Sequence, residues 1–185
     1  MAMPDTARRY TVQDVLAFPK DGNRYELVDG ELLVTPAPRP VHQIVVDEMG
    51  DRLRAYMKGY PGVARIFSSA ADISWDDKTL VQPDLFVVPE AEVSRDWRTY
   101  RTLLLAVEVL SPSSGRADRV VKRRRYQRQG VGTYWVVDVD ARVVEVWQAA
   151  DQRPEIVTDV LRWRLSPSVA ELTIRLENVF AALPA

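Results

Sequence analysis

The sequence of 185 residues contains no cysteine, which excludes disulfide bonds and thiolate metal sites and suits a cytoplasmic protein. It contains a single histidine, so a metal site built from several histidines is excluded as well. No apolar run approaches the length of a membrane span, and the first residues have neither the basic start nor the apolar core of a signal peptide. The formal net charge is −1, so a site for a polyanion has to come from local clustering of basic residues.

The composition is that of a soluble globular protein. Apolar residues make up 46% of the chain and charged residues 28%. The length suffices for one domain with a substantial core and falls short of two, and no internal repeat or low-complexity linker divides the chain. We therefore expect residues 1–185 to form a single domain.

Apolar spacing and turn residues predict the secondary structure. Spacings of i, i+3 and i+4 indicate helices, and the Asp29-Gly30 pair indicates a hairpin turn. The predicted elements are a helix at 11–18, a hairpin at 24–34, a helix from Pro40 to Gly59, strands at 63–75, 81–88 and 103–110, a polar loop at 89–102, a helix at 116–129 ended by Gly130, a hairpin at 133–148 and a mixed C-terminal region. This order predicts an α/β (α+β) fold with a central mixed sheet flanked by helices.

Two of the predicted strands each carry one carboxylate in an apolar run, Asp84 in residues 81–88 and Glu108 in residues 103–110. Such runs usually lie in a sheet that is covered on both faces, where an unpaired carboxylate costs several kcal/mol. Two carboxylates roughly 4 Å apart would repel by about 4 kcal/mol at an effective dielectric constant of 20. A divalent cation between them would turn this repulsion into a binding site.

The helix that follows the second strand presents Asp118, Lys122 and Tyr126 at i, i+4 and i+8, and hence on one face. Glu108 lies near the C-terminal end of its strand, where open α/β sheets usually bind ligands. The alternatives are a solvated strand end for Asp84, a structural salt bridge to an arginine for Glu108 and an exposed position for Lys122. We favour convergence of the three side chains in one site.

An ordered set of motifs resembles a known family. The motifs are Pro83-Asp84, then Val107-Glu108-Val-Leu-Ser-Pro112, then Asp118-x-x-x-Lys122-x-x-x-Tyr126, then Tyr134-Trp-Val-Val-Asp138, together with Tyr25–Glu31 and His42. The set resembles the family named "putative restriction endonuclease", a branch of the PD-(D/E)xK nuclease superfamily, over about residues 25–147. The resemblance implies a restriction-endonuclease-like fold and hydrolysis of phosphodiester bonds in DNA.

The chain departs from the superfamily pattern at one position. That pattern places a lysine two residues after the second acid, where this sequence has Leu110. The resemblance implies that the lysine has moved to the next helix as Lys122. Asp84 and Glu108 would then hold Mg²⁺ or Mn²⁺, and Lys122 would assist the reaction.

The same helix is strongly basic, with seven arginine or lysine residues between positions 116 and 128 and Asp118 as its one acid. A DNA backbone would relieve their mutual repulsion, as would acidic partners within the protein such as Glu90 and Glu92. We take Arg116, Arg119 and Arg123 as candidate nucleic-acid-binding residues.

Several other residues allow two interpretations. His42 lies at the start of the long helix and is either a capping or surface residue or a residue near the active site. Glu26 and Glu31 are either exposed strand residues or further acids for the metal. The same two interpretations apply to Asp138. Tyr134 and Trp135 are most simply core aromatics. The apolar hairpin around Val143–Trp147 would allow pairing across a two-fold axis in a homodimer.

Three functions remain in competition. The leading one is a metal-dependent DNA endonuclease that needs no membrane. The second is a non-catalytic nucleic-acid-binding or interaction module that retains the nuclease fold, which Leu110 and the absence of an overall basic charge favour. The third is a metal-dependent hydrolase of a different phosphate ester.

Overall fold

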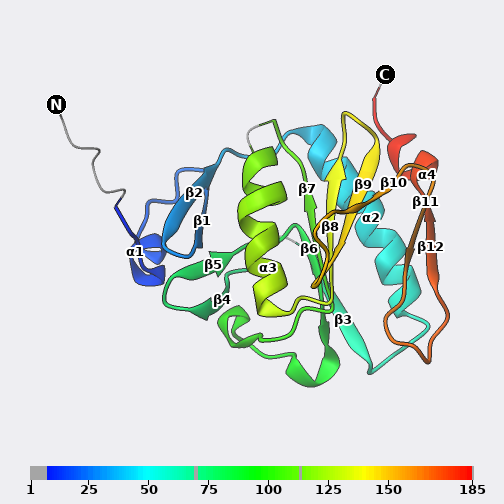
Figure 1. Ribbon diagram of the computed structural model, residues 1–185, viewed down its shortest axis with the longest axis horizontal. Coiled ribbons are helices and arrows are strands. Elements are labelled where there is room, and N and C mark those ends of the chain that lie inside the picture. Colours follow the sequence, from blue (N-terminus) through cyan, green and yellow to red (C-terminus); the bar gives the residue numbers. More distant parts are fainter. Residues whose placement is uncertain (1–7, 69–70, 113, 185) are drawn as a thin grey trace.

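The computed structural model describes residues 8–68, 71–112 and 114–184, and it confirms the predicted mixed α+β fold (Figure 1). The elements are α1 (Val12–Leu16), β1 (Arg24–Val28), β2 (Glu31–Thr35), α2 (Pro40–Met57), β3 (Ala64–Ser68), β4 (Ile73–Asp76), β5 (Thr79–Val81), β6 (Leu85–Pro89), β7 (Leu105–Val109), the π-helix η3 (Ala117–Lys122), α3 (Arg123–Gln129), β8 (Thr133–Asp138), β9 (Val143–Gln148), β10 (Glu155–Val157), β11 (Val160–Trp163), β12 (Leu172–Arg175) and α4 (Leu176–Phe180). The predicted loop at 89–102 holds two short 3₁₀ turns, Glu90–Glu92 and Trp97–Thr99.

The central sheet has six strands in the order β10-β9-β8-β7-β6-β3. The β7–β8 pair is parallel, and the other pairs are antiparallel, so the sheet is mixed as predicted. β7 lies in the middle of the sheet and all five of its residues are buried. A strand that is covered on both faces needs a nearly continuous run of apolar residues, and β7 has such a run.

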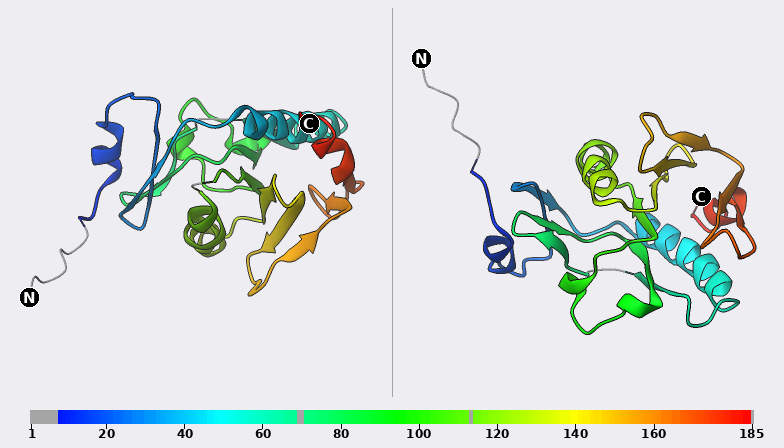
Figure 2. Two further views of the ribbon diagram at one scale, coloured as in Figure 1. Left: turned by 90° about the horizontal axis from the view of Figure 1, so that it is seen from above. Right: turned by 60° about the horizontal axis from the view of Figure 1, so that its bottom comes forward.

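Strand alternation sends side chains of β7 to opposite faces of the sheet. Leu105, Val107 and Val109 join the core beneath α2, whereas Ala106 joins a second core with Tyr126 of α3. Figure 2 shows α2 and α3 on opposite sides of the sheet. Because Glu108 follows the alternation of Ala106, it points to the α3 side.

A second, antiparallel sheet of four strands has the order β2-β1-β5-β4. The β1–β2 hairpin turns at Asp29 and Gly30, which both have positive φ (52° and 81°), as the Asp-Gly signal predicted. Thr11 caps α1 through a capping box with Asp14. This sheet brings β1 beside the end of the central sheet, where the site is formed (Figure 1).

The structure corrects three details of the sequence analysis. The run at 81–88 is not one strand, because Pro83 has no N–H to donate to a ladder and Asp84 lies between β5 and β6. The predicted helix at 116–129 begins as a π-helix in which the Arg123 N–H donates to the Asp118 carbonyl. β9 is not an edge strand, since β10 pairs with Val144–Val146, so the expected route to a dimer through this strand is closed.

Two further expectations were the absence of a signal peptide and the absence of a membrane span. The expected absence of a signal peptide rests on residues 1–5, which lie outside the described residues. Within the described part of the chain, no helix is both long enough and apolar enough to cross a bilayer.

Candidate active site

Asp84 lies at the point where the second sheet meets the central sheet, directly before β6. It is 3% exposed, and its Oδ2 accepts hydrogen bonds from the Val109 N–H at 2.8 Å and from His42 Nε2 at 3.0 Å. Its Oδ1 accepts a hydrogen bond from Arg24 Nη2 at 2.8 Å. Burial by itself raises the pKa of Asp84, but His42, Arg24 and the Val109 N–H together lower it to about 2, so the carboxylate is charged.

Glu108 lies on β7, one position beyond the Leu85–Val107 pair that joins β6 to β7. It is 1% exposed, and its Oε1 accepts hydrogen bonds from Lys122 Nζ and from the Tyr126 hydroxyl, both at 3.0 Å. Burial raises the pKa of Glu108 well above its usual value. Lys122 opposes that shift, and the charges of the neighbouring carboxylates reinforce it. Lys122 alone does not offset the effects of burial and of the neighbouring carboxylates on the pKa of Glu108.

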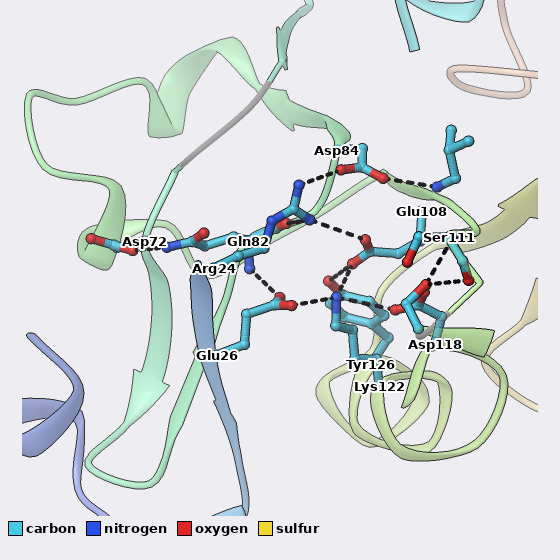
Figure 3. Close-up of polar contacts among 12 residues, drawn as sticks. Arg24, Glu26, Asp72, Gln82, Asp84, Glu108, Ser111, Asp118, Lys122 and Tyr126 are labelled. Atoms are coloured by element: carbon cyan, nitrogen blue, oxygen red, sulfur yellow. Dashed lines mark hydrogen bonds and ion pairs between the residues drawn. The ribbon is translucent and has the colours of Figure 1, made fainter. Parts of the chain in front are cut away.

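Lys122 is buried, which excludes the exposed position considered as an alternative. Its Nζ lies 2.7 Å from Glu26 Oε2, 3.0 Å from Glu108 Oε1 and 3.1 Å from Asp118 Oδ1 (Figure 3). Burial by itself lowers the pKa of Lys122, but these three carboxylates hold it well above its usual value. Lys122 is thus an ammonium held by three carboxylates. The shared helix face predicted that Lys122 would lie beside Asp118 but not that Glu26 would join them.

The π-helical turn explains how this face reaches the site. A π-helix closes its turn with one more residue than an α-helix and often occurs at functional sites. Here the wider turn carries Asp118 and Lys122, which are both about 2% exposed, toward Glu26 and Glu108. Regular α-helical spacing predicted the shared face but not the change of helix type.

Arg24 stands between the two acids that the sequence singled out (Figure 3). Its Nη2 contacts Asp84 Oδ1 at 2.8 Å, and its Nη1 lies 4.0 Å from Glu108 Oε2. Nη1 also donates to the carbonyl of Gln82 at 3.2 Å. A single guanidinium therefore faces both acids, which places Asp84 and Glu108 in one site while giving Glu108 an arginine neighbour as well.

Among the described residues, four carboxylates and two permanent cations form this buried cluster: Glu26, Asp84, Glu108 and Asp118 with Arg24 and Lys122. The cluster contains two more carboxylates than permanent cations. A divalent cation would supply the missing charge. The donor set fits a hard cation, because Asp84 Oδ1 and Glu108 Oε2 are carboxylate oxygens that already face one positive group.

The residues present suit a divalent cation that takes few of its ligands from the protein. Within the described ranges, no three histidine, aspartate or glutamate side chains form a ready cluster for a metal ion. Mg²⁺ commonly keeps several waters and takes one or two carboxylates from the protein, so Asp84 and Glu108 suffice as its candidate ligands.

The site opens to solvent through adjoining cavities that share His42. A cavity of about 20 Å³ is lined by Asp84, Glu108 and Lys122, and it has room for one water-sized body. A cleft of about 250 Å³ lies on the Arg24 side and one of about 210 Å³ on the side of Leu110. Leu110, in the position of the superfamily lysine, presents an apolar wall to the second cleft.

His42 and Glu26 lie in this site, although Glu26 was an exposed strand residue by default and His42 a cap or surface residue in one of its interpretations. His42 is 6% exposed, and its Nδ1 has no hydrogen-bond partner among the described residues. Glu26 is 1% exposed and also accepts a hydrogen bond from the Gln82 N–H at 2.7 Å. Glu31, in contrast, is exposed.

The three candidate nucleic-acid-binding arginines have different surroundings. Arg116 is exposed at an open cleft that Arg124 and Arg128 also line. Arg119 contacts Asp138 at 2.6 Å and Glu145 at 2.5 Å, and Arg123 lies over the Trp147 ring at 4.6 Å. Acidic and aromatic partners within the protein therefore already relieve part of the repulsion along this helix.

The acidic partners of the basic helix are not those considered from the sequence. Glu90 contacts Arg65 instead, at 2.6 Å. Glu92 accepts hydrogen bonds from the N–H groups of Arg101 and Thr102. Both glutamates lie in the 3₁₀ turn after β6, and their partners are on β3 and in the segment before β7.

The sequence analysis missed Arg24 as a site residue. In the sequence, Arg24 is the first residue of a hairpin strand of mixed polarity and looks like an exposed residue. The alternation in residues 24–28 puts Arg24 and Glu26 on one face, and this was the available signal. Knowing that this face is buried requires the packing of β1 against the central sheet.

Comparison with solved structures defines the fold class. The chain is similar to a protein from Anabaena variabilis ATCC 29413 whose crystal structure is described as that of a "putative nuclease belonging to DUF820". The TM-score is 0.76 at 17% identity, and the match covers 93% of this chain and 98% of the other. The chain therefore shares its fold with that protein.

Comparison with family models gives the family. Residues 12–177 match the model of the Uma2 family, which is described as "Putative restriction endonuclease". The chain belongs to this family, as its motifs predicted. A comparison with curated proteins returns no match.

Proposed function

We propose that this protein is a metal-dependent DNA endonuclease that hydrolyses phosphodiester bonds. Asp84 and Glu108 would hold Mg²⁺ or Mn²⁺, and Lys122 would assist. The observation that carries the proposal is the buried cluster in which four carboxylates face two permanent cations. Membership of the restriction endonuclease family supports the reaction class and DNA as the substrate.

Each side chain has a defined task in this proposal. The Val109 N–H and His42 hold Asp84 through Oδ2, which leaves Oδ1 facing Arg24. Glu108 is oriented through Oε1 by Lys122 and Tyr126, which leaves Oε2 toward the same point. When bound there, a divalent cation supplies an activated water and polarises the scissile phosphate.

Lys122 contributes a fixed positive charge. Because its pKa is well above its usual value, it stays protonated at neutral pH. An ammonium held by three carboxylates is preorganised and offsets negative charge that develops on phosphoryl oxygens nearby. The clefts beside the site give a phosphodiester two approaches, one past Arg24 and one past Leu110.

The test is a cleavage assay over supercoiled, linear duplex and single-stranded DNA with Mg²⁺, Mn²⁺ and EDTA. We expect cleavage that depends on the divalent cation and falls by about a thousandfold or more in Asp84→Ala and Glu108→Ala. Glu90→Gln is the matched control, because Glu90 contacts Arg65 beyond the far end of β6 and should retain full activity.

The competing functions give different results in the same assay. DNA binding without cleavage under any divalent cation would favour a binding module that retains the nuclease fold. Hydrolysis of small phosphate esters without DNA cleavage would favour a different phosphate-ester hydrolase. Cleavage that survives both acid substitutions would remove Asp84 and Glu108 from the mechanism.

A further inference from the structure

Arg24 and Lys122, the two permanent cations of the cluster, are held very differently. The Lys122 side chain is 3% exposed and lies within 3.1 Å of three carboxylates. The Arg24 side chain is 22% exposed, contacts Asp84 at 2.8 Å and lies 4.0 Å from Glu108. Arg24 is therefore the less enclosed cation and stands at the mouth of the site.

Arg24 faces the one oxygen of Asp84 and the one oxygen of Glu108 that accept no hydrogen bond from the other described residues of the site. Asp84 Oδ2 is taken by His42 and the Val109 N–H, and Glu108 Oε1 by Lys122 and Tyr126. Asp84 Oδ1 and Glu108 Oε2 both face the guanidinium. These two oxygens are also the ones that the protein can offer to a divalent cation, so Arg24 and the cation require the same position.

Arg24 also has space into which it can withdraw. It lines the small cavity with Asp84 and Glu108, and it lines the neighbouring cleft of about 250 Å³ together with Asn23, Pro36 and Gln82. An arginine side chain is long, flexible and weakly hydrated, so it can pair with a carboxylate in one position and with a phosphate in another.

We propose that Arg24 is a resident counter-ion that holds the metal site together without a metal, yields its place to the divalent cation and so sets the cation affinity of the site. This inference rests on the proposed function, since it assumes that Asp84 and Glu108 bind the cation. Once it has moved into the cleft, the guanidinium lies where the substrate enters. There it pairs with phosphate oxygens of the substrate in place of the Asp84 carboxylate.

The first test measures Mn²⁺ binding by isothermal titration calorimetry on the full chain, independently of activity. Arg24→Met removes the competing charge while keeping an apolar stem. We expect it to bind Mn²⁺ about tenfold more tightly than the wild type, and Arg24→Lys to fall between the two. Arg65→Met is the matched control, because it removes an arginine paired with Glu90 at a distance from the site.

The result separates this inference from the function on which it rests. If the wild type binds Mn²⁺ and both Arg24 variants bind it equally or more weakly, the counter-ion role is wrong and the metal site stands. If the wild type and both Arg24 variants bind no Mn²⁺, the metal site itself is wrong, and this inference is overturned with it.

The second test needs no variant and so does not depend on folding of the substituted chains. Phenylglyoxal modifies accessible arginines, and mass spectrometry of the peptides gives the extent at each position. We expect modification of Arg24 in the wild type to rise severalfold when Mn²⁺ is added, while that of Arg65 stays constant. Unchanged or reduced modification of Arg24 with bound Mn²⁺ would overturn the exchange.

Discussion

The two faces of β7 carry side chains of different chemistry. On the α2 side, Leu105, Val107 and Val109 pack into an apolar core. On the α3 side, Ala106 joins an aromatic core, but Glu108 enters a cluster of buried charges. The comparison shows that one strand can stabilise the fold through one face while it carries a costly site on the other.

The difference also separates stability from function. Buried apolar side chains stabilise in proportion to the area they remove from water. The charged cluster carries an excess of negative charge, and strained or destabilised groups are common at functional sites. Substitutions on the α2 face should therefore act on folding, and those on the α3 face on both folding and chemistry.

Lys122→Met should have the largest effect. It removes the ammonium that lies 2.7–3.1 Å from Glu26, Glu108 and Asp118 and leaves these acids buried without their cation. We expect a loss of about 3–5 kcal/mol in the free energy of unfolding and no residual DNA cleavage. Urea denaturation and the cleavage assay measure the two effects.

Lys58→Met is the control for Lys122→Met, since Lys58 is an exposed lysine at the end of α2. It should leave stability and activity near those of the wild type. If Lys122→Met is as stable as Lys58→Met, the buried acids do not depend on Lys122, and the contrast between the two faces is lost.

Leu53→Ala probes the opposite face. Leu53 on α2 is fully buried in the apolar core, so we expect a loss of about 2–5 kcal/mol in the free energy of unfolding. The cleavage rate per folded molecule should stay unchanged, because no charge of the site is altered. Leu16→Ala, at a leucine that is 40% exposed, should cost far less. A fall in the rate of folded Leu53→Ala would show that the faces are coupled.

The pH dependence of stability tests the charged face alone. The folded pKa of Glu108 is raised above its ordinary 4.5, so the folded state holds this proton more tightly and stability falls as pH rises from about 4.5 toward the folded pKa. Asp84 acts in the opposite sense. Its folded pKa of about 2 lies below 3.8, so its contribution of about 2 kcal/mol is present above pH 3.8 and is lost as pH falls toward 2.

Glu108→Gln should remove the decline above about pH 4.5 and keep the acid limb that Asp84 produces. The measurement is urea denaturation in EDTA at intervals from about pH 3 to pH 8, with Leu53→Ala as the comparison. Leu53→Ala should lower the whole curve without changing its shape. Parallel curves for wild type and Glu108→Gln would contradict the raised pKa of Glu108.

Much of the fold was predictable because its signals are local. The Asp29-Gly30 turn and the burial of residues 105–109 follow from residue type and alternation. The strand expected at 81–88 was wrong, because Pro83 interrupts it. The π-helical turn at Ala117–Lys122 was not predictable, since the i, i+4 and i+8 spacing of Asp118, Lys122 and Tyr126 is equally that of a regular α-helix.

The site was predictable in part for the same reason. Asp84 and Glu108 stand out as charges in apolar runs, and Lys122 shares a helix face with two polar residues. Arg24 and Glu26 lie in a hairpin of mixed polarity, where a charge looks like an exposed one. Only the packing of the second sheet against the central sheet shows that these two side chains complete the cluster.

The smallest expected effect distinguishes two arginines of the basic helix. Arg116 is exposed, so Arg116→Gln should weaken DNA binding a few-fold and lower the slope of affinity against salt by about one, with no change in stability. Arg119 is held by Asp138 and Glu145, so Arg119→Gln should lower stability by about 1 kcal/mol and change DNA affinity less. Fluorescence anisotropy over a salt series and urea denaturation measure these quantities.

The reverse pattern, with DNA affinity depending on Arg119 and not on Arg116, would show that DNA displaces Asp138 and Glu145 and that the paired arginines of this helix belong to the binding surface.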